Sequence, residues 1–194
     1  MDEEPVDHSA YSAGEPELQV VPISTEHLDE LMAIELASFA TPWSRRLFID
    51  ELAFGPSRIY LGLLFGDRLV GYIGAMLVLD EVHITTFAVD ARHRSRGFGK
   101  LLLLHVMTIA RDRGSVAATL EVRASDRGAQ QLYQRIGFVP AGIRKNYYAE
   151  EGEDGLVMWA HDLQGPTVTE HLGAIASELI AINYPMPNHS MGAD

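Results

Sequence analysis

A short basic loop that ends in two glycines lies at the start of an expected helix near the middle of the chain. Its residues are Arg94, Ser95, Arg96, Gly97, Phe98, Gly99 and Lys100, with Arg92 just before them. The N-terminus of a helix leaves backbone N–H groups unpaired and carries a partial positive charge, so this turn can bind a phosphate or a pyrophosphate. Glycine has no Cβ, which lets a ligand approach the backbone closely. The structural alternative is an ordinary basic loop that caps a helix.

Two common nucleotide-binding loops do not match this spacing. The dinucleotide fingerprint needs three glycines in another arrangement and an acidic residue about 20 positions later. A Walker loop needs Ser or Thr directly after a Gly-Lys pair, and here Gly99-Lys100 is followed by Leu101. The loop therefore belongs to neither class.

A carboxylate and a tyrosine follow the loop at positions that would allow acid–base chemistry. Glu121 interrupts the apolar, β-prone run from Ala117 to Val122, and burial can make such a carboxylate basic enough to act as a general base. Its structural alternative is a solvent-facing residue, or one paired with Arg123 two positions along the same face. Tyr133 lies on the apolar stripe of the next expected helix, where its structural alternative is a core aromatic.

The apolar periodicity predicts the elements that hold these side chains. We expect strands at residues 18–22, 58–65, 69–78, 82–89, 117–123, 138–146 and 156–161. We expect helices after a cap at Ser24 or Thr25, at 45–54, at 97–113, after a cap at Ser125 or Asp126, and from Pro166 onward. A Gly-Asp pair at 66–67 predicts a hairpin turn.

This order of elements predicts a mixed α/β sheet flanked by helices. A helix connects the strands at 82–89 and 117–123, so we expect these two strands to be parallel, with their crossover at the centre of the sheet. Ligands of such sheets bind at the carboxyl ends of the strands beside the crossover. The basic loop and Glu121 both fall there.

Composition indicates one domain with two acidic ends. Of the 194 residues, 47% are hydrophobic, which is enough for a core, and there is no cysteine. Of the net charge of −12, residues 1–17 carry −6 and residues 162–194 carry −4. We interpret residues 1–17 as a disordered acidic tail, 18–162 as the main domain and 163–194 as a C-terminal helical extension.

The same composition excludes several classes of protein. No basic stripe is present, which argues against a nucleic-acid partner. No apolar run reaches the roughly 18–20 residues of a membrane helix, and the acidic start differs from a signal peptide, so we expect no membrane partner and a cytoplasmic location. The eight histidines have no metal-binding spacing. We therefore infer no metal and interpret His83 as a structural residue.

Residues 94–99 resemble the Q/R-x-x-G-x-G/A signature of the GNAT acyltransferase superfamily. Further segments resemble its RimI branch in order: TPWS at 41–44, LVLDE at 77–81, LEVRAS at 120–125, QLY at 131–133, IGF at 136–138 and IRKNYY at 143–148. The resemblance covers about residues 18–162. It implies the GNAT fold, with a parallel crossover between the fourth and fifth strands, and a GNAT acetyltransferase domain over those residues.

The resemblance implies direct transfer of acetyl from acetyl-CoA, as cosubstrate, to the N-terminal α-amine of a protein, of the ribosomal-protein-alanine type. It assigns Glu121 as general base through a water molecule and Tyr133 as general acid to the departing thiolate. The residues that it implies for binding acetyl-CoA are Phe87, Ala88 and Val89, beside an expected β-bulge, and the loop from Arg94 through Lys100.

Four more residues match family positions. Trp43, Tyr147 and Tyr148 match positions on the substrate side, with plain packing as the alternative. The family commonly has Asn where this chain has Asp126, and that Asn contacts the cofactor. A carboxylate would repel the phosphates of CoA, so we expect Asp126 to cap a helix and leave its contact with acetyl-CoA open.

Other functions remain open at this stage. The chain could acetylate internal lysines or a small amine, or hold acetyl-CoA without catalysis. An α-amine, with a pKa of about 7.7–8.0, is partly neutral at physiological pH, whereas a lysine near 10.4 is almost fully charged. The helix expected from Pro166 carries one apolar stripe, formed by Val168, Leu172, Ile175 and Leu179. This stripe either docks on the chain's own domain or offers a partner surface.

Overall fold

The computed structural model describes residues 16–187, so most of the expected acidic tail lies outside the described residues. Within them the strands are β1 (Leu18–Pro22), β2 (Arg58–Phe65), β3 (Arg68–Val78), β4 (Glu81–Val89), β5 (Ala117–Arg123), β6 (Val139–Tyr148) and β7 (Glu153–His161). The α-helices are α1 (Leu28–Ser38), α2 (Arg45–Leu52), α3 (Phe98–Asp112), α4 (Arg127–Gln134) and α5 (Pro166–Ile180). The expected order of elements is confirmed.

The largest boundary difference is in the last hairpin. β6 reaches Tyr148 and β7 begins at Glu153, so the turn is shorter than the gap between the expected strands at 138–146 and 156–161. Asp154 accepts hydrogen bonds from the Lys145 ammonium at 2.6 Å and from the Asn146 N–H at 2.9 Å. These contacts hold acidic residues in a strand that their own propensity disfavours.

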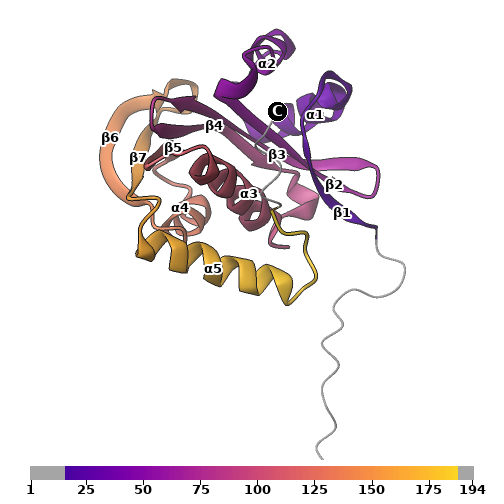
Figure 1. Cartoon of the computed structure of the whole chain (residues 1–194). Helices are drawn as coiled ribbons and strands as arrows, with labels where there is room; N and C mark the ends of the chain where they lie inside the picture. The colour runs from indigo at the N-terminus through magenta and orange to yellow at the C-terminus, as the bar shows by residue number, and fades with distance from the viewer. Residues whose placement is uncertain (1–15, 188–194) are drawn as a thin grey trace, which may run out of the picture.

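All the strands of the described chain form one mixed sheet in the order β1-β2-β3-β4-β5-β7-β6. β4 and β5 are parallel, and the other neighbouring pairs are antiparallel. Helix α3 connects β4 to β5, as expected for a parallel crossover. The sheet therefore has the predicted topology, with the crossover at its centre (Figure 1).

Helices cover both faces of this sheet (Figure 1). On one face, α3 and α5 bury residues such as Leu101, Leu102 and Ile175 in a large core that includes residues of β1 to β5 and of β7. On the other face, α1 and α2 pack Leu31 and Phe48 into a second, smaller core. The two cores make β3 and β4 the buried middle of the molecule.

β4 and β5 pair only over the first part of their length. The parallel ladder begins at Glu81 and ends where Ile84 meets Leu120, although the strands continue to Val89 and Arg123. The two carboxyl-terminal halves are therefore left without hydrogen bonds to each other. This opening lies in the sheet directly before the loop that starts α3.

A β-bulge precedes the unpaired half of β4. In the ladder with β3, Gly74 meets Thr86 and Ala75 meets Ile84, so Thr85 is the extra residue. Because of the bulge, the even-numbered residues of β4 face opposite sides of the sheet before and after Thr85. Ile84 packs in the larger core, whereas Ala88 packs in the smaller one. Phe87 consequently faces α3 and Thr86 faces the side of α1.

The C-terminal helix docks on its own domain. The apolar stripe of α5 predicted from the sequence is buried in the larger core at all its positions, Val168, Leu172, Ile175 and Leu179. The chain after α5 then returns toward the start of α3, where the Tyr184 hydroxyl donates to the Arg96 carbonyl at 2.7 Å. No helix of residues 16–187 is long and apolar enough to cross a membrane.

Candidate active site

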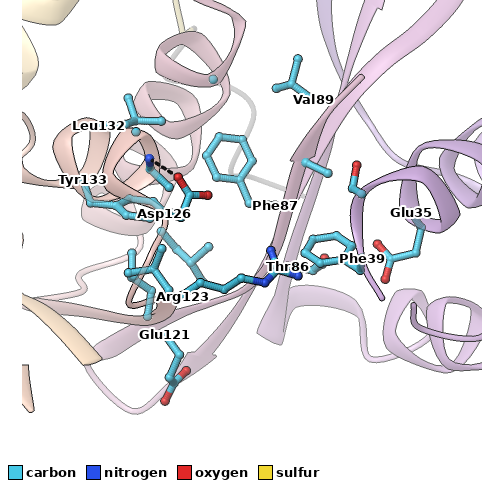
Figure 2. Close-up of a pocket in the computed structure, with 18 of the residues that line it drawn as sticks. Glu35, Phe39, Thr86, Phe87, Val89, Glu121, Arg123, Asp126, Leu132 and Tyr133 are labelled. Atoms are coloured by element: carbon cyan, nitrogen blue, oxygen red, sulfur yellow. Dashed lines mark hydrogen bonds between the residues drawn. The ribbon is translucent and has the colours of Figure 1, made fainter. Parts of the chain in front are cut away.

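A cavity of about 880 Å³ occupies the opening between β4 and β5. Residues from both faces of the sheet line it: Phe39 and Trp43 from the segment after α1, Gly99 from α3 and Tyr133 from α4. In Figure 2, Phe39, Phe87 and Tyr133 lie around one space, with Glu121 at its edge. All but one of the residues predicted for the site line this cavity, the exception being Arg96.

The loop before α3 presents its backbone to the cavity. Gly97 is the N-cap of α3 and has φ +87°, a left-handed conformation that favours glycine. Ser95, two residues earlier, also has a positive φ, of 61°. A Cβ added to Gly99 would lie 3.3 Å from Leu132 Cδ2 and 3.4 Å from Phe87 Cζ. The first turn of α3 therefore has unpaired N–H groups, and its surroundings leave little room for a side chain at Gly99.

The basic side chains of the loop differ in what they contact. The Arg96 guanidinium lies 4.7 Å from the centroid of the Phe65 ring, so Arg96 packs on aromatic surface and does not line the cavity. Arg92 is ion-paired with Asp90. Arg94 and Lys100 line the cavity, the latter with its ammonium 2.8 Å from a Glu178 oxygen.

Glu121 is held between two basic side chains. Its side chain is 7% exposed, and one carboxylate oxygen lies 2.8 Å from His83 Nε2 on β4. The other oxygen lies 2.9 Å from the Arg144 guanidinium on β6. The expected alternative of a pair with Arg123 is wrong, because that guanidinium is ion-paired with Glu151.

His83 and Arg144 are the site residues that sequence reasoning missed. The interpretation of His83 as a structural residue stays open, and the structure adds its direct contact with the candidate base. The parallel register pairs His83 with Thr119, two residues before Glu121, and side chains two residues apart on a strand share a face. The sequence carries no local signal for this register.

Tyr133 lies inside the aromatic part of the site. It is 6% exposed, and its ring centroid lies 6.4 Å from that of Phe87 and 5.8 Å from that of Phe138. Burial raises the pKa of Tyr133 well above its ordinary value of 10, and Tyr148 and Asp126 raise it further. The hydroxyl therefore keeps its proton at neutral pH and can serve as an acid.

Asp126 caps helix α4, as expected. Its Oδ1 accepts a hydrogen bond from the Ala129 N–H at 2.9 Å, drawn as a dashed line in Figure 2. Asp126 also lines the cavity, so a contact with acetyl-CoA stays a prediction. Gln130, which is buried and was not predicted, donates to the carbonyls of Arg123 and Ala124 and fixes the junction between β5 and α4.

The substrate-side candidates also line the cavity. The rings of Tyr147 and Tyr148 meet edge to face at 5.1 Å, and the Tyr148 hydroxyl lies 3.4 Å from the Glu121 carbonyl. Trp43 packs against Phe48 at 5.4 Å. These three residues thus combine the packing role with a place on the cavity wall. Within residues 16–187, no three His, Asp or Glu side chains gather as a metal site.

Known proteins are similar to this chain in both sequence and fold. The sequence profile of the Acetyltransferase (GNAT) family matches residues 28–138. Ribosomal protein bS18-alanine N-acetyltransferase of Salmonella typhimurium is 38% identical over 138 residues, which are 70% of this chain and 92% of its own length. This chain belongs to the GNAT acetyltransferase family.

Solved structures of GNAT proteins agree with the fold. The ribosomal-protein-S18-alanine N-acetyltransferase of Escherichia coli has a TM-score of 0.69 and 31% identity, covering 75% of this chain and 94% of the other. Ard1 from Thermoplasma volcanium has the same TM-score with 25% identity, covering 74% of this chain and 97% of the other. The expected GNAT fold is confirmed.

Proposed function

We propose that this protein transfers the acetyl group of acetyl-CoA to the N-terminal α-amine of a protein, with an alanine-starting ribosomal protein as its partner, in the cytoplasm. The observation that carries the proposal is a single cavity that joins the start of α3 to Glu121 and Tyr133. Relatives named ribosomal protein bS18-alanine N-acetyltransferases, at 33% and 38% identity, support the same substrate class.

The described residues fit acetyl-CoA along one wall of the cavity. The start of α3, with Gly97 and Gly99, offers unpaired N–H groups to the pyrophosphate. Beyond Ile84, β4 has no ladder with β5, so the backbone of Phe87–Val89 has no strand partner on that side and can bind the amides of the pantetheine arm. The Val89 carbonyl accepts a hydrogen bond from Arg94 Nε at 3.0 Å, which leaves the other groups of this edge for the pantetheine arm. Arg94 and Lys100 add charge for the phosphates.

The reaction at this site is a direct attack of the amine on the thioester. The nitrogen lone pair forms the C–N bond, and the C–S bond breaks. Glu121 removes a proton from the nitrogen through a water molecule, and Tyr133 donates its proton to the CoA thiolate. Acid–base assistance of this kind contributes about 10²–10⁴-fold to a rate. The chain has no cysteine, so an acetyl-cysteine intermediate is excluded.

A CoA-release assay with two peptides tests the proposal. Both begin Ala-Arg and contain lysines, but one has a free N-terminus and the other a blocked one. We expect turnover on the free peptide alone, reduced about 100-fold in Glu121→Gln. Glu26→Gln, at an exposed position of the Thr25–His27 turn, is the matched control.

Two other results would assign another function. Equal turnover on the blocked peptide would mean acetylation of lysine. No turnover on either peptide, with acetyl-CoA still raising the melting temperature, would mean a binding role.

A further inference from the structure

A second carboxylate borders the cavity on the side of α1. Glu35 is only 1% exposed, yet it lines the cavity together with Thr86. Figure 2 shows the Glu35 carboxylate on the far side of Thr86 and Phe39 from Glu121. A buried carboxylate is costly unless it is paired or hydrogen-bonded. The hydrogen-bond partners of Glu35 therefore indicate the role of this buried carboxylate.

Glu35 ends a chain of hydrogen bonds that leads back to the cavity. The Trp43 N–H donates to Glu35 Oε1 at 2.7 Å, and the Tyr72 hydroxyl donates to Oε2. The Tyr72 oxygen also lies 3.2 Å from Thr86 Oγ1, and either hydroxyl can donate in that contact. Since Thr86 directly precedes Phe87 on β4, these hydrogen bonds connect the buried carboxylate of Glu35 to the strand edge proposed for acetyl-CoA.

Acetylation of an α-amine takes two protons from the nitrogen. An ammonium loses one before it can attack, and the nitrogen loses another once the C–N bond has formed. One of these protons is balanced by the proton that the CoA thiolate receives, and the other is released to solvent. Glu121 can hold only one proton at a time. The reaction therefore has a place for a second acceptor.

We propose that Glu35 is this second acceptor, which the substrate ammonium reaches through Thr86 and Tyr72; the proposal rests on the function proposed above. The ammonium proton passes to Thr86 Oγ1, the proton of Thr86 passes to the Tyr72 oxygen, and that of Tyr72 passes to Glu35 Oε2. The nitrogen keeps its electron pair, and Glu35 becomes a carboxylic acid. Glu121 takes the later proton, and Glu35 returns its own to solvent by the reverse route.

The surroundings of Glu35 suit this role. Burial raises the pKa of Glu35 from 4.5 to about 6, against a smaller lowering by the Trp43 N–H. At pH 7 the group is thus ionised, but it is a stronger base than an exposed carboxylate. Arg123 of β5 also reaches the α1 side of the cavity, where its guanidinium lies 5.7 Å from the Phe39 ring centroid.

The variants Tyr72→Phe and Glu35→Gln test the hydrogen-bond chain through the pH dependence of kcat/KM. Phe keeps the ring of Tyr72 and removes only the hydroxyl. For the free peptide, we expect kcat/KM to fall about 10-fold or more at pH 7 in both variants. At pH 9.5 the amine is already neutral, so the deficit should shrink to about twofold. Glu121→Gln should keep its deficit at both pH values.

An equal deficit at pH 7 and pH 9.5 would overturn the proposal. That result is expected if Glu35 only anchors the Trp43 backbone, because a misplaced loop is not repaired by a neutral amine. Glu26→Gln is again the control for replacing a carboxylate by an amide. Thermal unfolding of each variant separates a lost proton route from a lost fold.

A second measurement does not depend on turnover. The ¹³C resonance of the Glu35 carboxyl, assigned by its loss in Glu35→Gln, should titrate near pH 6 in the wild type. In Tyr72→Phe its pKa should rise, because the carboxylate loses a donor. An unchanged titration in Tyr72→Phe would overturn the proposal. If the peptide assay instead finds no turnover on the peptide with a free N-terminus, the proposed function fails. The titration of Glu35 still decides whether the hydrogen bonds from Thr86 through Tyr72 to Glu35 exist.

Discussion

At the residue scale, the two candidate catalytic side chains have opposite surroundings. Glu121 lies between the His83 ring and the Arg144 guanidinium, and it contacts both through its carboxylate oxygens. Tyr133 lies among aromatic rings, where burial raises its pKa and keeps the hydroxyl protonated. The candidate acid therefore starts the reaction with its proton, and the candidate base lies among polar side chains.

Replacing Tyr133 by Phe should lower kcat about 100-fold and leave the KM for acetyl-CoA nearly unchanged, because the ring packing is kept. In the wild type, kcat should not fall as the pH rises to 9.5, since the raised pKa of Tyr133 keeps the acid protonated. A pH series of initial rates measures both. An alkaline loss of kcat centred below pH 9.5 that is absent from Tyr133→Phe would contradict the assignment.

The pKa of Glu35 also has a consequence for stability. Its folded value of about 6 is above the ordinary 4.5, so the folded state binds the proton more tightly. This contribution to stability is full below pH 4.5 and is lost as the pH rises through 6. Between pH 8 and pH 5 it should be worth about 1 kcal/mol. Urea unfolding should show this gain in wild type and Glu26→Gln; its persistence in Glu35→Gln would contradict the assignment.

The sequence brought out Glu121 and Tyr133 as candidates, but it did not bring out the partners of Glu121. Glu121 was a candidate because a carboxylate in an apolar strand is unusual, and its role as general base, implied by the family resemblance, stays a prediction. Its partners were not recognisable, because His83 is 38 positions away and Arg144 is 23 positions away along the chain. Contacts across a parallel ladder and a hairpin depend on register, which local sequence patterns do not encode.

At the element scale, the start of α3 and the bulge in β4 determine the shape of the site. The glycine pattern predicted the helix start to within one residue. The position of the bulge at Thr85 was not predictable, because nothing in the local pattern of β4 marks the extra residue. The bulge turns Thr86 toward α1 and Phe87 toward α3, so neighbouring residues serve different sides of the cavity.

A side chain at Gly99 should interfere with acetyl-CoA at the start of α3. In Gly99→Val we expect the KM for acetyl-CoA to rise about 10-fold with a smaller change in the peptide KM, because Cβ branches would cover the N–H groups. Gly173→Ala on α5 is the matched control, since a Cβ there meets nothing within 4 Å. It should stabilise the fold by about 0.5–1 kcal/mol. Equal KM values for acetyl-CoA in the wild type and Gly99→Val would contradict the proposed binding of acetyl-CoA at the start of α3.

At the scale of the whole molecule, the C-terminal extension supports the loop before α3. Glu178 of α5 is ion-paired with both Lys100 and Arg135, and Tyr184 bonds to the backbone of Arg96. The apolar stripe of α5 allowed either docking on the domain or a partner surface, and the structure shows docking. The return of the chain to the loop had no signal in the sequence. The boundary placed between residues 162 and 163 stays a prediction.

Removing the Tyr184 hydroxyl should loosen the loop before α3. In Tyr184→Phe we expect a rise of a few-fold in the KM for acetyl-CoA, with kcat unchanged, and a loss of about 1 kcal/mol of stability. Steady-state kinetics and urea unfolding measure the two effects. A change in kcat with an unchanged KM for acetyl-CoA would show that the C-terminal extension does not act through the binding of acetyl-CoA.

The incomplete ladder between β4 and β5 also constrains the order of events in a turnover. The cavity has walls from α1 on one face of the sheet and from α3 and α4 on the other. Two molecules that enter from opposite faces can meet inside the sheet without passing each other. Neither has to leave before the other arrives, and double-reciprocal plots for acetyl-CoA and peptide should therefore intersect rather than run parallel.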